Sequence, residues 1–199
     1  MSPRNSFAEA RRTRASILER AVEVSSVEGL EGVTIGRLAG DLDMSKSGVI
    51  GHFGTKESLQ LATLEAALDV FRREVWERAS GKEPGLPRLL ALCDAWTSYL
   101  RREVFPGGCF LTAAAAEFDG RGGPVRQAVA DALELWYRVL EAEVRTAVEA
   151  GDLPRETDPR DVALQLNALA MAANQRVQLL GDRAATASAR RLMRAVLSA

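Results

Sequence analysis

The chain has little of the side-chain chemistry that most enzymes and metal sites require. Its 199 residues include one histidine and two cysteines, Cys93 and Cys109, which stand in no CxxC or Cys/His cluster. No nucleophile elbow, phosphate-binding loop or zinc-ligand spacing occurs. The single histidine, His52, lacks the neighbouring carboxylate and cysteine partners of a base or metal ligand. We therefore expect no enzymatic activity, no catalytic residue, no metal site and no cofactor.

Long apolar runs and a dominant charge are missing as well. No stretch approaches ~18 consecutive apolar residues, so we expect no membrane span and no membrane partner. The polar start MSPRNSFAEARR has no apolar signal-peptide region, and the two cysteines fit a reduced compartment, so we expect a cytoplasmic protein. The net charge is −1, so any nucleic-acid function has to be argued from local motifs.

The periodicity that is present is helical throughout. No segment of convincing length alternates with the two-residue period of a strand, and turn-rich stretches at 80–85, 105–108 and 119–124 separate the apolar stripes. We predict an all-α fold of about nine helices, with a small N-terminal domain at 1–55 and a helical body at 56–199. The longer predicted helices cover residues 7–27, 55–79, 87–103, 109–118, 124–150 and 158–180, with a last helix after 182.

The most informative stretch is TIGRLAGDLDMSKSGVIGHFGTKES, at residues 34–58. Thr34, Ser45 and Thr55 each precede a helical pattern as N-cap residues. Asp43 and Met44 form the turn between the first two short helices. A short second helix set on a first by a tight turn is the geometry that enters the DNA major groove.

One face of the second short helix is apolar and the other is polar. Val49 and Phe53 lie four residues apart and should pack on the first helix. Lysine and serine on the outer face suit base edges, glycines permit close approach, and threonine, histidine or lysine at the helix ends suit phosphates. The predicted DNA-contacting residues are Thr34, Ser45, Lys46, Ser47, Gly48, Ile50, Gly51, His52 and Lys56.

This segment resembles the DNA-binding region of the tetracycline-repressor (TetR) family of bacterial transcription regulators, from about residue 14 to residue 61. The resembling residues are Ala21, Gly29, Thr34, Ile35, Leu38, Ala39, Ser45, Lys46, Val49, His52, Phe53, Lys56, Glu57 and Leu59. The chain departs from the family in having Ile50 where a phosphate-contacting tyrosine is usual, Ser25 where an aromatic is frequent, and Gly51 where a histidine, tyrosine or tryptophan is frequent. The resemblance implies an all-helical dimer that binds a double-stranded operator.

The helix predicted at 158–180 is apolar on nearly every face. A surface helix shows one apolar stripe, so this one must be covered on at least two sides. It is either a central core helix or a helix that packs against its copy in a second subunit, and the resemblance favours a two-fold homodimer built from the last two helices. The predicted interface residues are Leu166, Ala170, Ala173, Val177, Leu192 and Val196.

TetR-like proteins usually hold a small-molecule effector in the helical body, and the resemblance implies such a pocket here. The candidate wall residues are Trp96, Tyr99, Phe110, Glu117, Phe118, Trp136, Met171 and Asn174. Aromatic residues at helical spacing are also compatible with ordinary core. Glu117 either recognises a cationic or hydroxylated ligand from a buried position or is a solvated acid at a helix end.

The sequence leaves three hypotheses of function. The first is a dimeric, sequence-specific transcriptional regulator, expected to be a repressor that a small-molecule effector releases from a palindromic operator. The second is a ligand-binding or protein-interaction module whose helix-turn-helix no longer binds DNA, motivated by Ile50 and the near-zero net charge. The third, an all-helical enzyme, has little support. Sequence does not distinguish repression from activation or identify the effector.

Overall fold

The computed structural model describes residues 3–198, with side chains from residue 8 onwards, and every regular element in that range is a helix. The helices are α1 (Pro3–Gly32), α2 (Ile35–Asp41), α3 (Lys46–Phe53), α4 (Lys56–Phe71), η1 (Arg72–Trp76), α5 (Glu77–Ala79), α6 (Leu86–Arg101), α7 (Phe110–Phe118), α8 (Pro124–Ala150), α9 (Pro159–Leu180) and α10 (Ala185–Val196). Because α4, η1 and α5 follow one another without a break, residues 3–198 form nine helical segments. The all-α prediction is confirmed.

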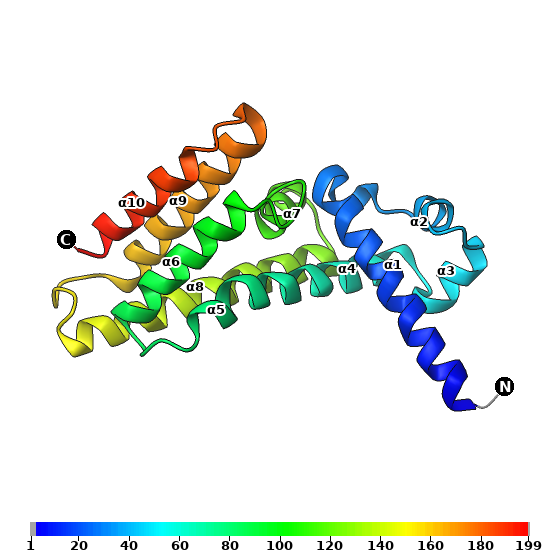
Figure 1. Cartoon of the computed structure of the whole chain (residues 1–199), viewed down its shortest axis with the longest axis horizontal. Coiled ribbons are helices and arrows are strands. Elements are labelled where there is room, and N and C mark those ends of the chain that lie inside the picture. The colour runs from blue at the N-terminus through cyan, green and yellow to red at the C-terminus, as the bar shows by residue number, and fades with distance from the viewer. Residues whose placement is uncertain (1–2, 199) are drawn as a thin grey trace.

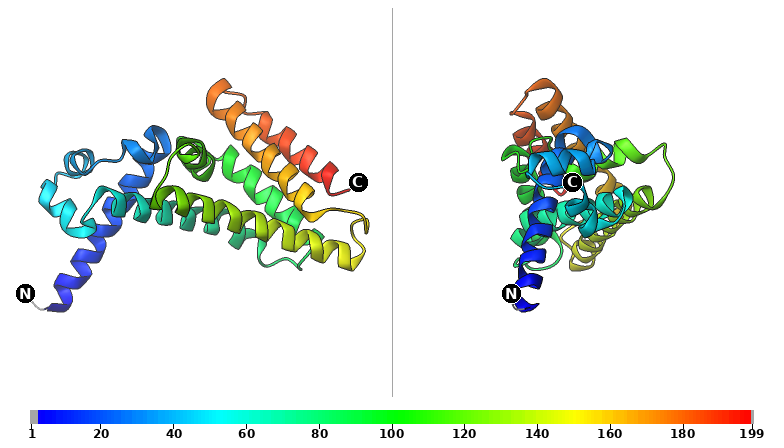
Figure 2. Two further views of the ribbon diagram at one scale, coloured as in Figure 1. Left: turned by 180° about the vertical axis from the view of Figure 1, so that it is seen from behind. Right: turned by 90° about the vertical axis from the view of Figure 1, so that its right-hand side faces the viewer.

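The molecule has a small head at one end of an elongated body (Figure 1). We use "head" for α1, α2, α3 and the first turns of α4, and "body" for the remaining helices. The N-terminal half of α1 projects beyond the head, and the C-terminus lies at the end of the body away from it. Figure 2 shows α9 and α10 side by side along one edge of the body, leaving their outer faces uncovered by other helices.

The head has its own apolar core. Ile17 and Ala21 from α1, Leu38 from α2, and Val49 and Phe53 from α3 belong to one buried cluster. Leu42 packs against this cluster as a partly buried side chain. The predicted packing of α3 on α2 is therefore confirmed, and its apolar spacing explains which face of α3 turns inward.

The helix that joins head to body contains one irregular turn. A single helix was predicted at 55–79, and instead α4 ends at Phe71 and continues through the π-helical turn η1 into α5. Val75 is fully buried inside this turn. A π-turn inserts one extra residue and rotates the helical residues after it, and such turns occur frequently at functional sites.

Local end signals explain where the long body helices begin and stop. Pro124 occupies the first turn of α8, and Gly151 ends that helix in the left-handed conformation. The Asp158 carboxylate accepts from the backbone N–H of Arg160, which caps α9 at 2.8 Å. Gly181 then stops α9 with a left-handed φ of 66°. No helix in residues 3–198 combines the length and the apolarity that crossing a bilayer needs.

The buried face of α9 corrects part of the predicted dimer interface. Leu166, Ala170, Ala173 and Val177 are each 8% exposed or less within a single chain. Because α8 and α10 pack against α9, these four side chains belong to the chain's own core and offer no surface to a second subunit. In α10, Leu192 is 52% exposed and Val196 is half-buried.

Candidate nucleic-acid interface and ligand cavity

Three side-chain caps shape the helix-turn-helix, and all three were predicted. The Thr34 hydroxyl accepts from the N–H of Arg37 at 3.1 Å, and the Ser45 hydroxyl accepts from the N–H of Gly48 at 3.0 Å. The Thr55 hydroxyl does the same for the third residue after it, also at 3.0 Å. Asp43 takes a left-handed φ of 52° in the turn between α2 and α3, as a short polar residue can.

The outer face of α3 is exposed and carries few large side chains. Lys46, Ser47, Ile50 and Gly51 are exposed, and a Cβ added at Gly51 would meet no atom within 4 Å. Gly48 is half-buried, and a Cβ there would lie 3.2 Å from the Ser45 hydroxyl. The face therefore presents an ammonium, a hydroxyl and bare backbone to solvent, which suits approach to a groove floor.

The three predicted phosphate contacts, Lys56, His52 and Thr34, all have neighbours within the chain. Lys56 donates to the Glu31 carboxylate at 2.9 Å and to the Glu31 carbonyl at 3.1 Å, so its ammonium group has an acidic neighbour; its contact with phosphate stays a prediction. His52 is half-buried, with its ring centroid 6.3 Å from that of Phe53. Thr34 is exposed but its oxygen caps α2. Contact of the other predicted residues with DNA stays a prediction.

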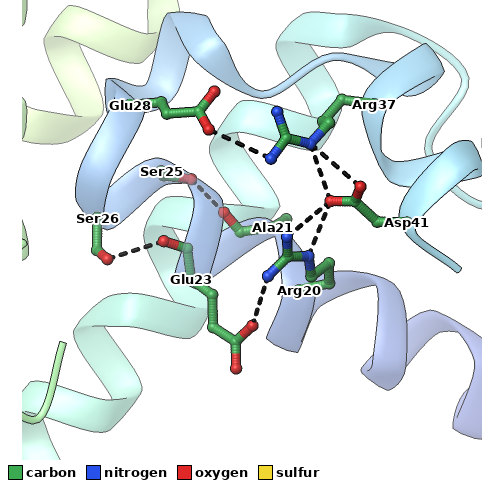
Figure 3. A network of polar contacts seen from close by, with 8 residues as sticks. All are labelled: Arg20, Ala21, Glu23, Ser25, Ser26, Glu28, Arg37 and Asp41. Carbon is green, nitrogen blue, oxygen red and sulfur yellow. Dashed lines mark hydrogen bonds and ion pairs between the residues drawn. The ribbon is translucent and has the colours of Figure 1, made fainter. Parts of the chain in front are cut away.

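An ion-pair network holds α2 against α1 (Figure 3). Asp41 accepts from Arg37 on its own helix at 3.0 Å and from Arg20 of α1 at 2.9 Å. Arg37 also reaches Glu28 at 3.3 Å, and Arg20 also binds Glu23. The hydrogen bond from Arg37, followed by that from Arg20, holds the pKa of Asp41 below its usual value. The network fixes the helix on which the recognition helix α3 rests.

Some basic residues near the N-terminus contact neighbouring side chains, and others lie exposed on the surface of α1. The Arg14 guanidinium lies 5.1 Å from the Phe53 ring centroid, and Arg20 belongs to the network of Figure 3. Arg11 and Arg12 are exposed on the projecting part of α1. The Arg4 side chain lies outside the described side chains.

The body contains a small cavity lined by two of the predicted effector residues with unpaired donors. Trp96 and Trp136 are 3% and 7% exposed, and their rings meet edge to face with centroids 5.0 Å apart. Both line a cavity of about 40 Å³, together with Met171. Among the described residues, neither indole N–H has a hydrogen-bond acceptor. An indole N–H is a donor only, so a molecule in this cavity would have to supply the acceptor.

Three other predicted wall residues belong to the packed core. Tyr99 is 1% exposed and meets Phe71 edge to face at 5.5 Å, and burial raises the pKa of its hydroxyl. Phe110 packs on Phe105 at 5.8 Å, and Phe118 is buried beneath the guanidinium of Arg121. None of Tyr99, Phe110 and Phe118 lines this cavity, and the buried Tyr99 hydroxyl has no hydrogen-bond partner among the described residues.

Glu117 fits neither of the two interpretations made from sequence. One carboxylate oxygen accepts from the N–H of Leu30 at 2.8 Å, and the other accepts from the N–H of Glu31 at 2.9 Å. These amides follow Gly29, where α1 breaks with φ 79°. A Cβ at Gly29 would lie 2.8 Å from both carboxylate oxygens, so only glycine admits this contact. Glu117 therefore ties the C-terminal end of α7 to the head.

Asn174 performs the matching function at the other end of α7. Its side-chain oxygen accepts from the N–H of Cys109 at 2.8 Å. The preceding Gly108 has a φ of 84°, and a Cβ there would lie 2.3 Å from the same oxygen. Asn174 thus joins the start of α7 to α9, and it does not line the cavity. Helix α7 is held by α9 at one end and by α1 at the other.

The cavity also contains residues that sequence reasoning missed. Asn167 is 5% exposed and donates to the Tyr137 hydroxyl at 2.9 Å and to the Met171 sulfur at 3.1 Å. An amide within the apolar run of α9 was the available signal, because buried polar side chains need partners. Phe71 of α4 and Thr112 of α7 also line the cavity. Nothing in the local sequence around them marks them as cavity residues.

The two thiols are protonated structural groups. Burial raises the pKa of Cys93 to about 12, and burial also raises the pKa of Cys109. Since the thiolate is the reactive form, neither sulfur is prepared for nucleophilic chemistry. Among the residues the structure describes, no group of three or more His, Cys, Asp or Glu side chains is arranged to hold a metal ion.

Comparison with known proteins agrees with this architecture. The family model "Bacterial regulatory proteins, tetR family" matches residues 17–63, and "Tetracyclin repressor-like, C-terminal domain" matches residues 85–193. No curated protein matches the sequence significantly.

Solved structures share the fold at low sequence identity. A TetR transcriptional regulator from Chloroflexus aurantiacus is 23% identical, with a TM-score of 0.88 and 96% of each chain covered. A TetR-family regulator from Cytophaga hutchinsonii is 20% identical, with a TM-score of 0.83, over 96% of this chain and 95% of that one. AibR, solved with isovaleryl coenzyme A and operator DNA, is 20% identical, with a TM-score of 0.71, over 90% of this chain and 95% of AibR. Since the second family model alone spans more than half of the chain, the protein belongs to the TetR family of bacterial transcription regulators.

Proposed function

We propose that the protein is a homodimeric repressor that binds a palindromic operator and is released from it by a small-molecule effector. The observation that carries the proposal is the outer face of α3, where Lys46, Ser47, Ile50 and Gly51 are exposed on a head whose apolar core is complete. An exposed polar surface on a short, well-capped helix is what a recognition helix requires. Ile50 adds an apolar group suited to a thymine methyl.

The outer faces of α9 and α10 supply the dimer surface in this proposal. Leu164, Met171 and Leu179 are 57%, 42% and 75% exposed. With the exposed Ala168 and Ala172, they recur at helical spacing along one face of α9, and Leu192 extends the patch onto α10. Monomeric proteins rarely leave such a contiguous apolar face in water. A second copy related by a two-fold axis would cover it and set two heads on successive half-sites.

Helix α7 is the route by which we expect ligand to influence DNA binding. Leu111, Thr112 and Ala115 on this helix line the cavity, whereas Glu117 at its end binds the head. A ligand that displaces α7 therefore alters the contact that orients the head. AibR, a fold relative, was solved with both a ligand and operator DNA, which supports the proposal that one protein of this fold binds both.

A mobility-shift assay with the DNA upstream of the protein's own gene tests the proposal. We expect a shifted band on a palindrome-containing fragment that random competitor DNA does not remove, with affinity falling as salt rises. Specific affinity should lie around 10⁻⁸–10⁻¹¹ M. Equal competition by random DNA would reject sequence-specific binding.

The same assay separates the alternative of a protein-interaction module. The exposed Ile50 on α3, 43% accessible, is the observation that favours it, because an apolar group on that face also suits a protein surface. That function predicts no salt-dependent association with any duplex, since phosphate neutralisation is then absent.

A further inference from the structure

Within residues 3–198, the cavity beside α7 is lined by two tryptophans whose buried indole N–H groups are unpaired, and by no charged side chain. The indole N–H groups of Trp96 and Trp136 lack acceptors among the described residues, and both side chains are more than nine-tenths buried. The polar side chains on the cavity wall, Thr112 and Asn167, are uncharged. The amide nitrogen of Asn167 is already bound to Tyr137 and Met171. The wall thus offers donors in apolar surroundings.

This lining disfavours a charged occupant of either sign. Among the wall residues there is no Lys or Arg to neutralise an anion and no Asp or Glu to neutralise a cation, so burying either ion would cost its hydration without a partner. The ring faces are also occupied. Phe71 and Trp136 meet at 90°, as do Trp96 and Trp136, with centroids 5.0 Å apart in both pairs. Faces covered by neighbouring ring edges do not form an open cage for a cation.

A larger outer groove on the surface lies next to the cavity, and the two share part of their walls. The groove has a volume of about 320 Å³ and shares Phe71, Leu111 and Trp136 with the inner cavity. Its rim includes Leu135, which is 57% exposed. The charged rim residues Asp69 and Arg72 lie 3.4 Å apart and pair with each other. The groove therefore has room for an apolar body that the small cavity alone does not.

We infer that the effector is an uncharged, largely apolar molecule with a hydrogen-bond acceptor that accepts from the indole N–H groups of Trp96 and Trp136. Its apolar part lies in the outer groove, and its acceptor, a carbonyl or an equivalent group, passes between Phe71 and Leu111 into the inner cavity. Phe71 is the last residue of α4 before the π-turn, so the occupant displaces the helix that carries the head. The inference rests on the effector role proposed above and specifies its chemistry.

Four probes built on one bicyclic skeleton test the inference by calorimetry on the full-length protein. Indane has no acceptor, 1-indanone has one carbonyl, indane-1-carboxylate is an anion, and 1-aminoindane is a cation at neutral pH. We expect 1-indanone to bind about tenfold more tightly than indane, because only the ketone satisfies the buried donors. Both ions should bind no better than indane. Equal binding of indane and indanone, stronger binding of either ion, or binding of no probe overturns the inference.

Two tryptophan variants test whether the preference for 1-indanone over indane depends on the indole donors. Trp96→Phe and Trp136→Phe remove one donor each and should reduce the indanone preference severalfold while leaving indane binding. Trp76→Phe is the matched control, since Trp76 lines only the outer groove and its ring faces the Arg88 guanidinium. A preference that survives both cavity variants overturns the inference. If a cavity variant unfolds, as circular dichroism would show, the four-probe comparison on the unaltered protein still decides.

A separate readout distinguishes this inference from the proposed function. Fluorescence anisotropy of labelled operator reports whether bound probe releases DNA. Preferential indanone binding without release keeps the ligand chemistry and rejects the effector role of the cavity. Suppose instead that a charged compound releases the DNA and that neither tryptophan variant changes its binding. That result keeps the effector role and rejects the inferred uncharged ligand.

Discussion

The head and the body differ in which polar and apolar groups they bury and which they leave exposed. In the head, the apolar cluster is closed by α1 to α4 of one chain, and its exposed large apolar side chains, among the residues described, are Val27 on α1 and Ile50 on α3. In the body, two tryptophan side chains bury donors without acceptors in the described structure, and the outer face of α9 leaves leucine side chains more than half exposed. The head is complete within one chain, whereas the body has surfaces suited to a ligand and to a second copy.

This difference agrees with our proposal that the body, and not the head, binds the effector and the second copy. The head has a core cluster of its own, and Val22 and Leu30 of α1 also pack into the core of the body. The body carries the features whose energy changes on association: an apolar face and unpaired buried donors. The two regions are joined by apolar packing of α1 into the body core and by polar contacts, of which α7 provides the one made by Glu117.

The largest effect should come from charging the uncovered face of α9. In the double variant Leu164→Glu/Leu179→Glu, two carboxylates replace the leucines that a second copy would cover, and the protein should become monomeric by light scattering. Operator affinity should then fall by about 10²–10⁴, because the two heads no longer bind as one linked unit. Leu135→Glu is the control, since Leu135 and Leu164 are both 57% exposed and Leu135 lies on α8. A dimer that persists in the double variant would place the interface elsewhere.

The next effect should come from the recognition helix. Lys46→Ala/Ser47→Ala removes the two exposed polar side chains at the start of α3 and should weaken operator binding about 10- to 100-fold, given the typical worth of base contacts. The thermal midpoint should be unchanged, because both side chains are exposed. Lys82→Ala is the matched control, since Lys82 lies in the exposed stretch before α6. Unchanged site preference in the double variant would show that another surface reads the sequence.

A smaller effect should follow from weakening the contact between head and body. Glu117→Gln replaces two charge-assisted acceptors by a single carbonyl oxygen and should lower the free energy of unfolding by about 1–3 kcal/mol in urea titration. Hydrogen exchange should show faster exchange at the amides of Leu30 and Glu31. Glu149→Gln, at an exposed site on α8, should change neither measurement. Unaltered protection of both amides in Glu117→Gln would mean that the contact is absent in solution.

The smallest effect should be a pH dependence that originates in the head. Because the pKa of Asp41 is lowered in the folded state by Arg37 and Arg20, its contribution to stability is fully present above its usual pKa of 3.8. That contribution is lost as the pH falls through the lower, folded value. The thermal midpoint should therefore fall less steeply below about pH 4 in Asp41→Asn than in the unaltered protein. Asp119→Asn, an exposed carboxylate outside the network of Figure 3, should retain the original slope.

The local sequence pattern alone was enough to predict the helices of the helix-turn-helix and the inward face of α3. Caps at Thr34, Ser45 and Thr55 act over three residues, and the inward face of α3 follows from the helical spacing of Val49 and Phe53. Both signals are contained in the segment they shape, so they can be recognised without the rest of the chain. The same holds for the start of α8 at Pro124 and its end at Gly151.

Long-range contacts decided what the body residues do. Glu117 meets amides 86 and 87 residues away, Asn174 meets an amide 65 residues away, and no local pattern encodes such distances. The inward direction of Leu166 and the outward direction of Leu164 depended on which neighbouring helices cover α9, because an all-apolar helix has no polar face to orient it. Composition therefore identified α9 as a packing helix, and only the arrangement of α8 and α10 around it selected the face left for a partner.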